Sequence, residues 1–128
     1  MFIYLRRVRL KDTDATGLIY FVQQFQWAME AFEEFLSSRG SPLASLIASP
    51  YSLPVVHAES DYKAPIRVGD LLEISIREII LGTSSMTVVY GFARAGEDIG
   101  LARIVHVCVD RATGHSVVIP PRLRQICI

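Results

Sequence analysis

The spacing of hydrophobic positions changes twice along the chain, from a strand-like to a helical period and back again, and these changes outline the fold. Residues 2–10 are rich in β-branched and aromatic side chains, which predicts a strand. After the turn-forming segment "KDTDATG", apolar residues recur at intervals of three and four, as on one face of an amphipathic helix. The predicted apolar face comprises Phe21, Phe25, Ala28, Met29, Phe32, Phe35 and Leu36.

The second half of the chain reads as strands joined by short turns. Leu72, Ile74 and Ile76 alternate with polar residues, residues 86–92 repeat that alternation, and a last long strand is predicted from about residue 99 to 110. Segments such as "RVGD", "LGTSS" and "RAGED" are typical hairpin turns, and hairpins produce an antiparallel sheet. "PLASLIAS" and "IPPRLRQICI" each predict a short helical segment.

The order of strand, long helix and about four further strands places the chain in the α+β class. A helix with a broad apolar face must bury that face against the sheet. The simplest architecture is a curved antiparallel sheet of about five strands wrapped round one long central helix, with a dimer covering what remains. The chain contains no internal repeat, low-complexity tract or long linker, so residues 1–128 are expected to form a single domain.

Composition narrows the classes of partner. Hydrophobic residues make up 51% of the chain and charged residues 20%, which predicts apolar surface hidden in subunit contacts or in a ligand groove. The 13 basic and 13 acidic residues balance, which argues against a nucleic-acid partner. Two cysteines are too few for a disulfide framework, and no Cys/His cluster predicts a metal. Without a signal peptide or a membrane-spanning stretch, the sequence predicts a cytoplasmic protein.

The segment before the helix carries two acids one residue apart, Asp12 and Asp14. A helix N-terminus presents unpaired N–H groups and a partial positive charge, which stabilise a carboxylate or a developing oxyanion. Gly17 permits a backbone conformation that is closed to other residues. One alternative is that an acid only caps the helix or forms a local Asx turn. Both interpretations can hold together, with Asp12 structural and Asp14 chemical.

These residues carry a resemblance to a known family. "DTDATGLIYF", followed by Trp27 and Glu30, resembles the signature of the hotdog-fold acyl-CoA thioesterases of the 4-hydroxybenzoyl-CoA thioesterase type. The resemblance covers nearly the whole chain and implies the hotdog fold and thioester hydrolysis. Within that family, "LPVVHAESDYKAPIRVGD" and "HVCVD" are most similar to the 1,4-dihydroxy-2-naphthoyl-CoA thioesterases of phylloquinone and menaquinone synthesis.

The resemblance implies roles for individual residues. Asp14 matches the catalytic carboxylate, which either attacks the thioester carbonyl and forms a mixed anhydride or activates a water molecule. The backbone N–H of Phe21 matches the group that polarises that carbonyl, while Gly17 and Tyr20 would shape the turn and the acyl pocket. Another branch of the family places its catalytic acid on the central helix, so Glu30 is the fallback candidate.

Other candidates have weaker signals. His57 is expected on a strand facing the helix, where it contacts either the acyl group or only the core or a subunit interface. Lys63, Arg67 and Arg103 are candidates for the coenzyme A phosphates, because arginine and lysine pair with phosphate oxygens. The alternative for each base is a solvated surface position. Coenzyme A belongs to the substrate, and no metal or other cofactor is expected.

The family resemblance also implies an assembly: a homodimer with its active site at the interface, and a homotetramer built from such dimers. Two rival functions remain open, a fatty acyl-CoA or acyl-carrier-protein thioesterase and a non-catalytic acyl-CoA binding module. A hotdog dehydratase is disfavoured, because one hydratase pattern requires a histidine five residues after the acid and Ile19 occupies that position.

Overall fold

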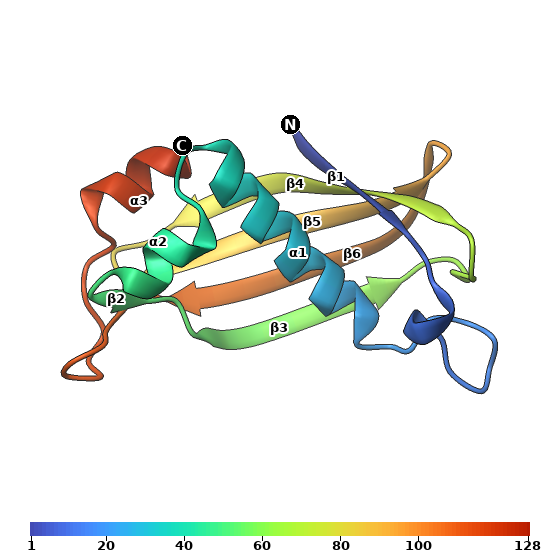
Figure 1. The fold of residues 1–128 in the computed structure, drawn as a ribbon, viewed down its shortest axis with the longest axis horizontal. Helices are drawn as coiled ribbons and strands as arrows, with labels where there is room; N and C mark the ends of the chain where they lie inside the picture. Colours follow the sequence, from blue (N-terminus) through green and yellow to red (C-terminus); the bar gives the residue numbers. More distant parts are fainter.

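The computed structural model describes residues 1–128 as a mixed α/β chain built on one five-stranded antiparallel sheet (Figure 1). The strands stand in the order β1-β4-β5-β6-β3, so β1 and β3 form the two edges. Their bounds are Phe2–Arg7 for β1, Val55–Tyr62 for β3, Leu71–Leu81 for β4, Ser85–Arg94 for β5 and Glu97–Val107 for β6. The predicted antiparallel sheet of about five strands is confirmed.

One 16-residue helix, α1, lies across one face of this sheet (Figure 1). Short elements gather beyond its C-terminus, and the loop that contains the two acids lies beyond its N-terminus. None of the helices combines the length and apolar composition that crossing a membrane requires.

The remaining bounds are Gln23–Ser38 for α1, Leu43–Ala48 for α2, Pro121–Ile126 for α3, Tyr51–Ser52 for β2, Val109–Asp110 for β7 and Leu10–Asp12 for the 3-10 turn η1.

The buried face of α1 is rotated from the face that the apolar spacing predicted. Gln24, Trp27 and Ala31 are completely buried, whereas Met29 is 37% exposed. Phe21 is 59% exposed and precedes the helix, which begins at Gln23. The predicted face wrongly included Phe21 and Met29, and it left out Gln24 because ranking by hydrophobicity does not select a polar side chain. Here the alanines allow the helix to approach the sheet closely, and the sheet supplies partners for the glutamine amide nitrogen.

Alternation along β3, which is regular beyond a bulge near its start, decides which of its side chains face α1. Val55 is paired with His106, and the register shifts between Val55 and His57. Beyond the bulge, Ser60 contacts Gln24 of α1 through a hydrogen bond. Because side chains alternate along the regular stretch from His57 to Ser60, the His57 side chain projects to the face of the sheet opposite Ser60. His57 is therefore not a core histidine, and its predicted place at a subunit interface stays a prediction.

Candidate active site

The loop between β1 and α1 doubles back on itself, so residues 12–14 run antiparallel to residues 18–20. Gly17 closes the turn with φ = +79°, a conformation that side chains disfavour, as predicted from the sequence. A β-bridge between Thr13 and Ile19 and two backbone hydrogen bonds hold the two limbs together. The Asp14 N–H donates to the Leu18 carbonyl at 3.0 Å, and the Tyr20 N–H donates to the Asp12 carbonyl at 2.8 Å.

Asp12 is a structural residue that ties this loop to β1. Its side chain is buried, and its Oδ2 accepts hydrogen bonds from the Arg9 N–H at 2.8 Å and from Arg6 Nη1 at 3.4 Å. Arg6 also donates from Nε to Glu30 Oε1 at 3.2 Å, and the Tyr4 hydroxyl donates to the same oxygen at 2.8 Å. Burial, together with this bond to Glu30, raises the pKa of Tyr4 to about 12. The network connects β1, the acidic loop and α1.

Asp14 has the opposite environment. Its side chain is exposed, and its Oδ1 accepts hydrogen bonds from the Thr16 hydroxyl and from the Thr16 N–H, the latter at 2.8 Å. The Thr16 hydroxyl, and then the Thr16 N–H, hold the pKa of Asp14 below its usual range. Oδ2 makes no hydrogen bond in the chain. The local Asx turn is thus confirmed for Asp14, but neither acid caps α1, whose N-cap is Val22 with no side-chain bond.

The start of α1 presents free backbone donors. The N–H groups of Phe21 and Val22 donate to no acceptor in the chain, whereas the Gln23 N–H donates to the Tyr20 carbonyl at 2.9 Å. Unpaired N–H groups at this end carry the positive pole of the helix dipole. They could therefore stabilise a negatively charged oxygen. The role predicted for the Phe21 N–H stays a prediction.

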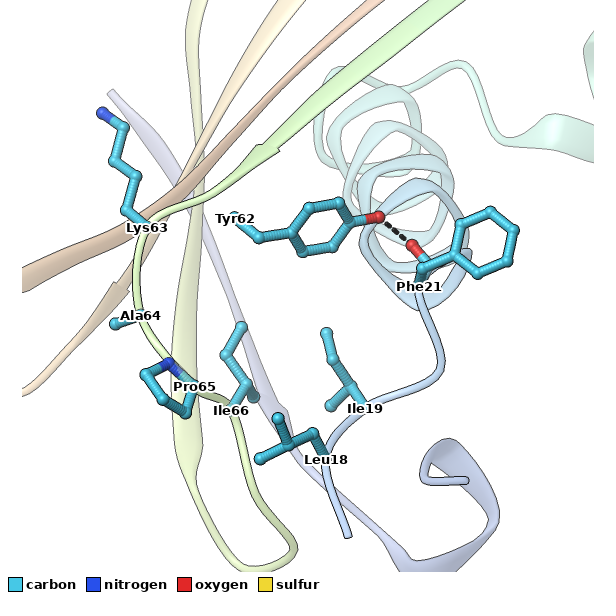
Figure 2. Close-up of a pocket in the computed structure, with 8 residues that line it drawn as sticks. All are labelled: Leu18, Ile19, Phe21, Tyr62, Lys63, Ala64, Pro65 and Ile66. Atoms are coloured by element: carbon cyan, nitrogen blue, oxygen red, sulfur yellow. Dashed lines mark hydrogen bonds between the residues drawn. The ribbon is translucent and has the colours of Figure 1, made fainter. Parts of the chain in front are cut away.

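A pocket of ≈ 390 Å³ opens beside these donors (Figure 2). The Tyr62 ring reaches across it, and its hydroxyl donates a hydrogen bond to the Phe21 carbonyl. Tyr20, which was predicted to shape the acyl pocket, is not part of the wall. The centre of its ring lies 5.0 Å from the centre of the Phe21 ring. The lining residues are Leu18, Ile19, Phe21, Tyr62, Lys63, Ala64, Pro65 and Ile66.

One of the three predicted phosphate-binding bases lines this pocket, and a second is adjacent to its wall in the sequence. Lys63 lines it, with Nζ 2.9 Å from Asp98 Oδ2, and Arg67 directly follows the pocket wall without an ion pair of its own. Arg103 and His57 are not in the wall. Both contact Glu59, at 3.4 Å and 3.5 Å, and their side chains are about half exposed.

Glu30, the fallback catalytic acid, is also outside the pocket wall, and its Oε1 is engaged by the two donors from β1 described above. No group of three or more histidine, cysteine or acidic side chains is arranged to hold a metal ion. Both cysteines are free and buried, and burial raises the pKa of Cys127 to about 11.

Three residues at the site were missed from the sequence: Thr16, Gln24 and Tyr62. Thr16 stands two residues after Asp14, a spacing typical of Asx turns, so a local signal existed. Gln24 lies four residues before Ala28 and therefore shares its buried face. Tyr62 gave no signal, because its contact with Phe21 joins segments 41 residues apart.

Comparison with known proteins identifies the family. The family model of the thioesterase-like superfamily matches residues 8–126. This chain belongs to that superfamily. Its relatives include a 1,4-dihydroxy-2-naphthoyl-CoA hydrolase from Synechococcus elongatus, 34% identical over 124 residues that cover 95% of this chain and 91% of the relative.

Solved structures of superfamily members have the same fold. A 1,4-dihydroxy-2-naphthoyl-CoA thioesterase from Synechocystis superposes with a TM-score of 0.91 at 31% identity, covering 98% of this chain and 94% of the other. A gentisyl-coenzyme A thioesterase gives 0.89 at 28% identity, covering 98% and 99%. The predicted resemblance to hotdog acyl-CoA thioesterases, and with it the class of thioester hydrolase, is confirmed.

Proposed function

We propose that this superfamily member hydrolyses an aromatic acyl-CoA, with 1,4-dihydroxy-2-naphthoyl-CoA as its substrate. Similarity to 1,4-dihydroxy-2-naphthoyl-CoA hydrolases and thioesterases supports this substrate. The position of Asp14 is the observation that supports the chemistry. Its exposed carboxylate has one oxygen without a hydrogen bond. The other limb of its loop leads to the pocket and to the unpaired N–H groups at the start of α1.

In this proposal the Phe21 N–H donates to the thioester carbonyl oxygen, and the apolar wall of the pocket receives the aromatic ring. As the carbonyl carbon becomes tetrahedral, charge grows on its oxygen, and a preorganised N–H stabilises that charge more than the ground state. Loss of such a donor typically costs about 3 kcal/mol of transition-state stabilisation.

The free Oδ2 of Asp14 can act as the nucleophile or as the general base. It attacks the carbonyl carbon, expels the coenzyme A thiolate and leaves a mixed anhydride that water hydrolyses, or it accepts a proton from a water molecule that attacks instead. Both routes need the ionised carboxylate, and the hydrogen bonds from Thr16 favour that form. Both routes remain open.

Coenzyme A enters as part of the substrate in this proposal, and no metal or other cofactor takes part. Lys63, which lines the pocket, and Arg67, which directly follows the wall in the sequence, are the proposed partners of its phosphates, while Arg103 is a poorer candidate because it pairs with Glu59 away from the wall. His57 and Tyr20 lie outside the wall of this single chain, so a role in the acyl pocket would require the partner subunit's site.

The proposed assembly is a homodimer in which the sheet of each subunit curves round its helix α1 and the active site lies between subunits, with tetramers built from these dimers. The exposed residues of the edge strand β3 and exposed apolar side chains such as Val55 and Val56 support this arrangement. The cytoplasmic location predicted from the sequence stays a prediction.

A thiol-release assay on a panel of thioesters tests the proposal. The panel holds 1,4-dihydroxy-2-naphthoyl-, gentisyl-, 4-hydroxybenzoyl-, short-chain and long-chain fatty acyl-CoA, and an acyl-carrier protein. We expect the naphthoyl thioester to have the highest kcat/KM and Asp14→Asn to lower it at least about 100-fold. Glu78→Gln, the same chemical change at an exposed position of β4, should leave it unchanged.

The possible outcomes are distinct. A preference for another aromatic thioester, such as gentisyl-CoA, would keep the mechanism and replace the substrate. Turnover that survives Asp14→Asn would transfer the catalytic role to another residue. If no thioester were cleaved while acyl-CoA still bound, the protein would be a binding module.

A further inference from the structure

The start of α1 lacks the usual local anchor. Its N-cap residue, Val22, provides no side-chain hydrogen bond, and the residues before it belong to an exposed loop. A helix start without a cap is free to fray. Yet the proposed reaction requires the Phe21 N–H to hold one position, because a displacement of about 1 Å in a catalytic group can lower the rate about 100-fold.

The end of β3 supplies the first missing anchor. Tyr62, its last residue, donates its hydroxyl hydrogen to the carbonyl of Phe21 across the pocket (Figure 2). Burial raises the pKa of Tyr62, so the hydroxyl stays protonated and remains a donor at neutral pH. The carbonyl and the N–H of Phe21 flank the same α-carbon, so fixing the carbonyl restricts the direction of the N–H.

The same strand end supplies a second anchor one helical turn further along. Gln24 is completely buried, and its Nε2 donates to the Ser60 hydroxyl and, at 3.1 Å, to the Asp61 carbonyl. Its Oε1 is buried without a partner, which is an energetic penalty that an apolar side chain would avoid. Gly100 provides the space, because a Cβ there would collide with the Gln24 amide.

We propose that Tyr62 and Gln24 are positioning residues that hold the first turn of α1 against the end of β3 and thereby aim the Phe21 N–H at the thioester oxygen. This inference rests on the proposed function. It explains why a buried amide with an unpaired oxygen stands at the start of the helix: its two N–H bonds fix the helix to the sheet. It also separates the Tyr62 hydroxyl, which positions, from the Tyr62 ring, which forms the pocket wall.

Steady-state kinetics of the full-length protein test the role of Tyr62. Tyr62→Phe keeps the ring and removes only the hydroxyl, so we expect kcat to fall about 10-fold to 100-fold while KM changes less than about 2-fold. Tyr51→Phe, which removes a hydroxyl at a different cavity beside α2 and α3, is the matched control and should change neither value. An unchanged kcat in Tyr62→Phe would overturn the proposal.

Gln24 is tested in the same way. Gln24→Met keeps the length of the side chain and loses both hydrogen bonds, and it should also lower kcat with little change in KM. Gln26→Met, on the exposed side of the same helix turn, is its control. If Gln24→Met unfolds the protein, Ser60→Ala removes one acceptor of the same amide and should give a smaller loss of kcat.

Nuclear magnetic resonance distinguishes failure of this inference from failure of the proposed function. In Tyr62→Phe, we expect the amide resonances of Phe21 and Val22 to shift and their order parameters to fall, whichever thioesters the wild type cleaves. Unchanged amide signals would overturn the positioning role even in an inactive protein. A wild type that cleaves no thioester would overturn the proposed function alone.

Discussion

Asp12 and Asp14 are the same residue type two positions apart, yet they occupy opposite environments. The Asp12 side chain is buried against Arg6 and the Arg9 N–H, and the Asp14 side chain is exposed with Thr16 as its only hydrogen-bond partner. The sequence suggested this division of roles without being able to prove it, because the partner Arg6 comes from the preceding strand. At this scale, local hydrogen bonds determine which acid is free to react.

The hydrogen bonds from Thr16 give Asp14 a testable pH dependence. They lower its pKa, so under the proposed mechanism the carboxylate persists above that pKa and activity is lost as the pH falls through it. Thr16→Val removes the hydroxyl and raises the pKa. We therefore expect the acid limb of the kcat/KM profile to move to higher pH in Thr16→Val.

Profiles of kcat/KM from neutral pH downward, with unfolding followed in parallel, check this shift. Thr16→Ser retains the hydroxyl and should keep the acid limb of the wild type. A limb that stays in place in Thr16→Val would mean that another group controls the acid side of the profile.

Among the elements, α1 differs most from its sequence-based description. The period of three and four correctly predicted a helix, but the buried face includes Gln24 and excludes Met29. A hydrophobicity pattern ranks side chains by their own polarity. It cannot include Ser60 and the Asp61 carbonyl, which satisfy the amide nitrogen of Gln24 from a strand 36 and 37 residues away.

Close packing between α1 and β6 predicts a specific cost for a single added methyl group. Gly100→Ala places a Cβ against the buried Gln24 amide, and overpacking of this kind typically costs about 1–3 kcal/mol of unfolding free energy. Urea denaturation of the two proteins measures the difference. Gly91→Ala is the matched control on the neighbouring strand, because its Cβ meets only the flexible end of the Arg77 side chain. Equal costs for both variants would contradict this account of the packing.

The whole molecule exposes one long edge of its sheet. Every residue of β3 except Ser60 is exposed in the single chain. Uncovered edges of this length usually pair with another strand, so the edge is the natural place for the proposed dimer contact. The oligomeric state itself stays a prediction.

Ala58→Pro tests that contact without disturbing the sheet within the subunit. Lys63 donates its N–H to the Ile99 carbonyl in the β3–β6 ladder, so by alternation the Ala58 N–H points to the free edge. Proline there removes only this outward donor. We expect sedimentation velocity to find a dimer or tetramer for the wild type and for Ala58→Val, and a smaller species for Ala58→Pro. A wild-type monomer would refute the assembly, and an unaffected Ala58→Pro would move the contact away from β3.

Local sequence patterns were enough to predict the class of elements, the antiparallel sheet and the acidic loop, because periodicity, hairpin turns and the requirement for glycine at residue 17 are local properties. The positions of His57, Gln24 and Tyr62 were decided only in the tertiary structure. The alternation of β3 relative to α1 places His57 on the face opposite Ser60, and the contacts of Gln24 and Tyr62 join residues at least 36 positions apart. Such contacts depend on strand register, which no local pattern specifies.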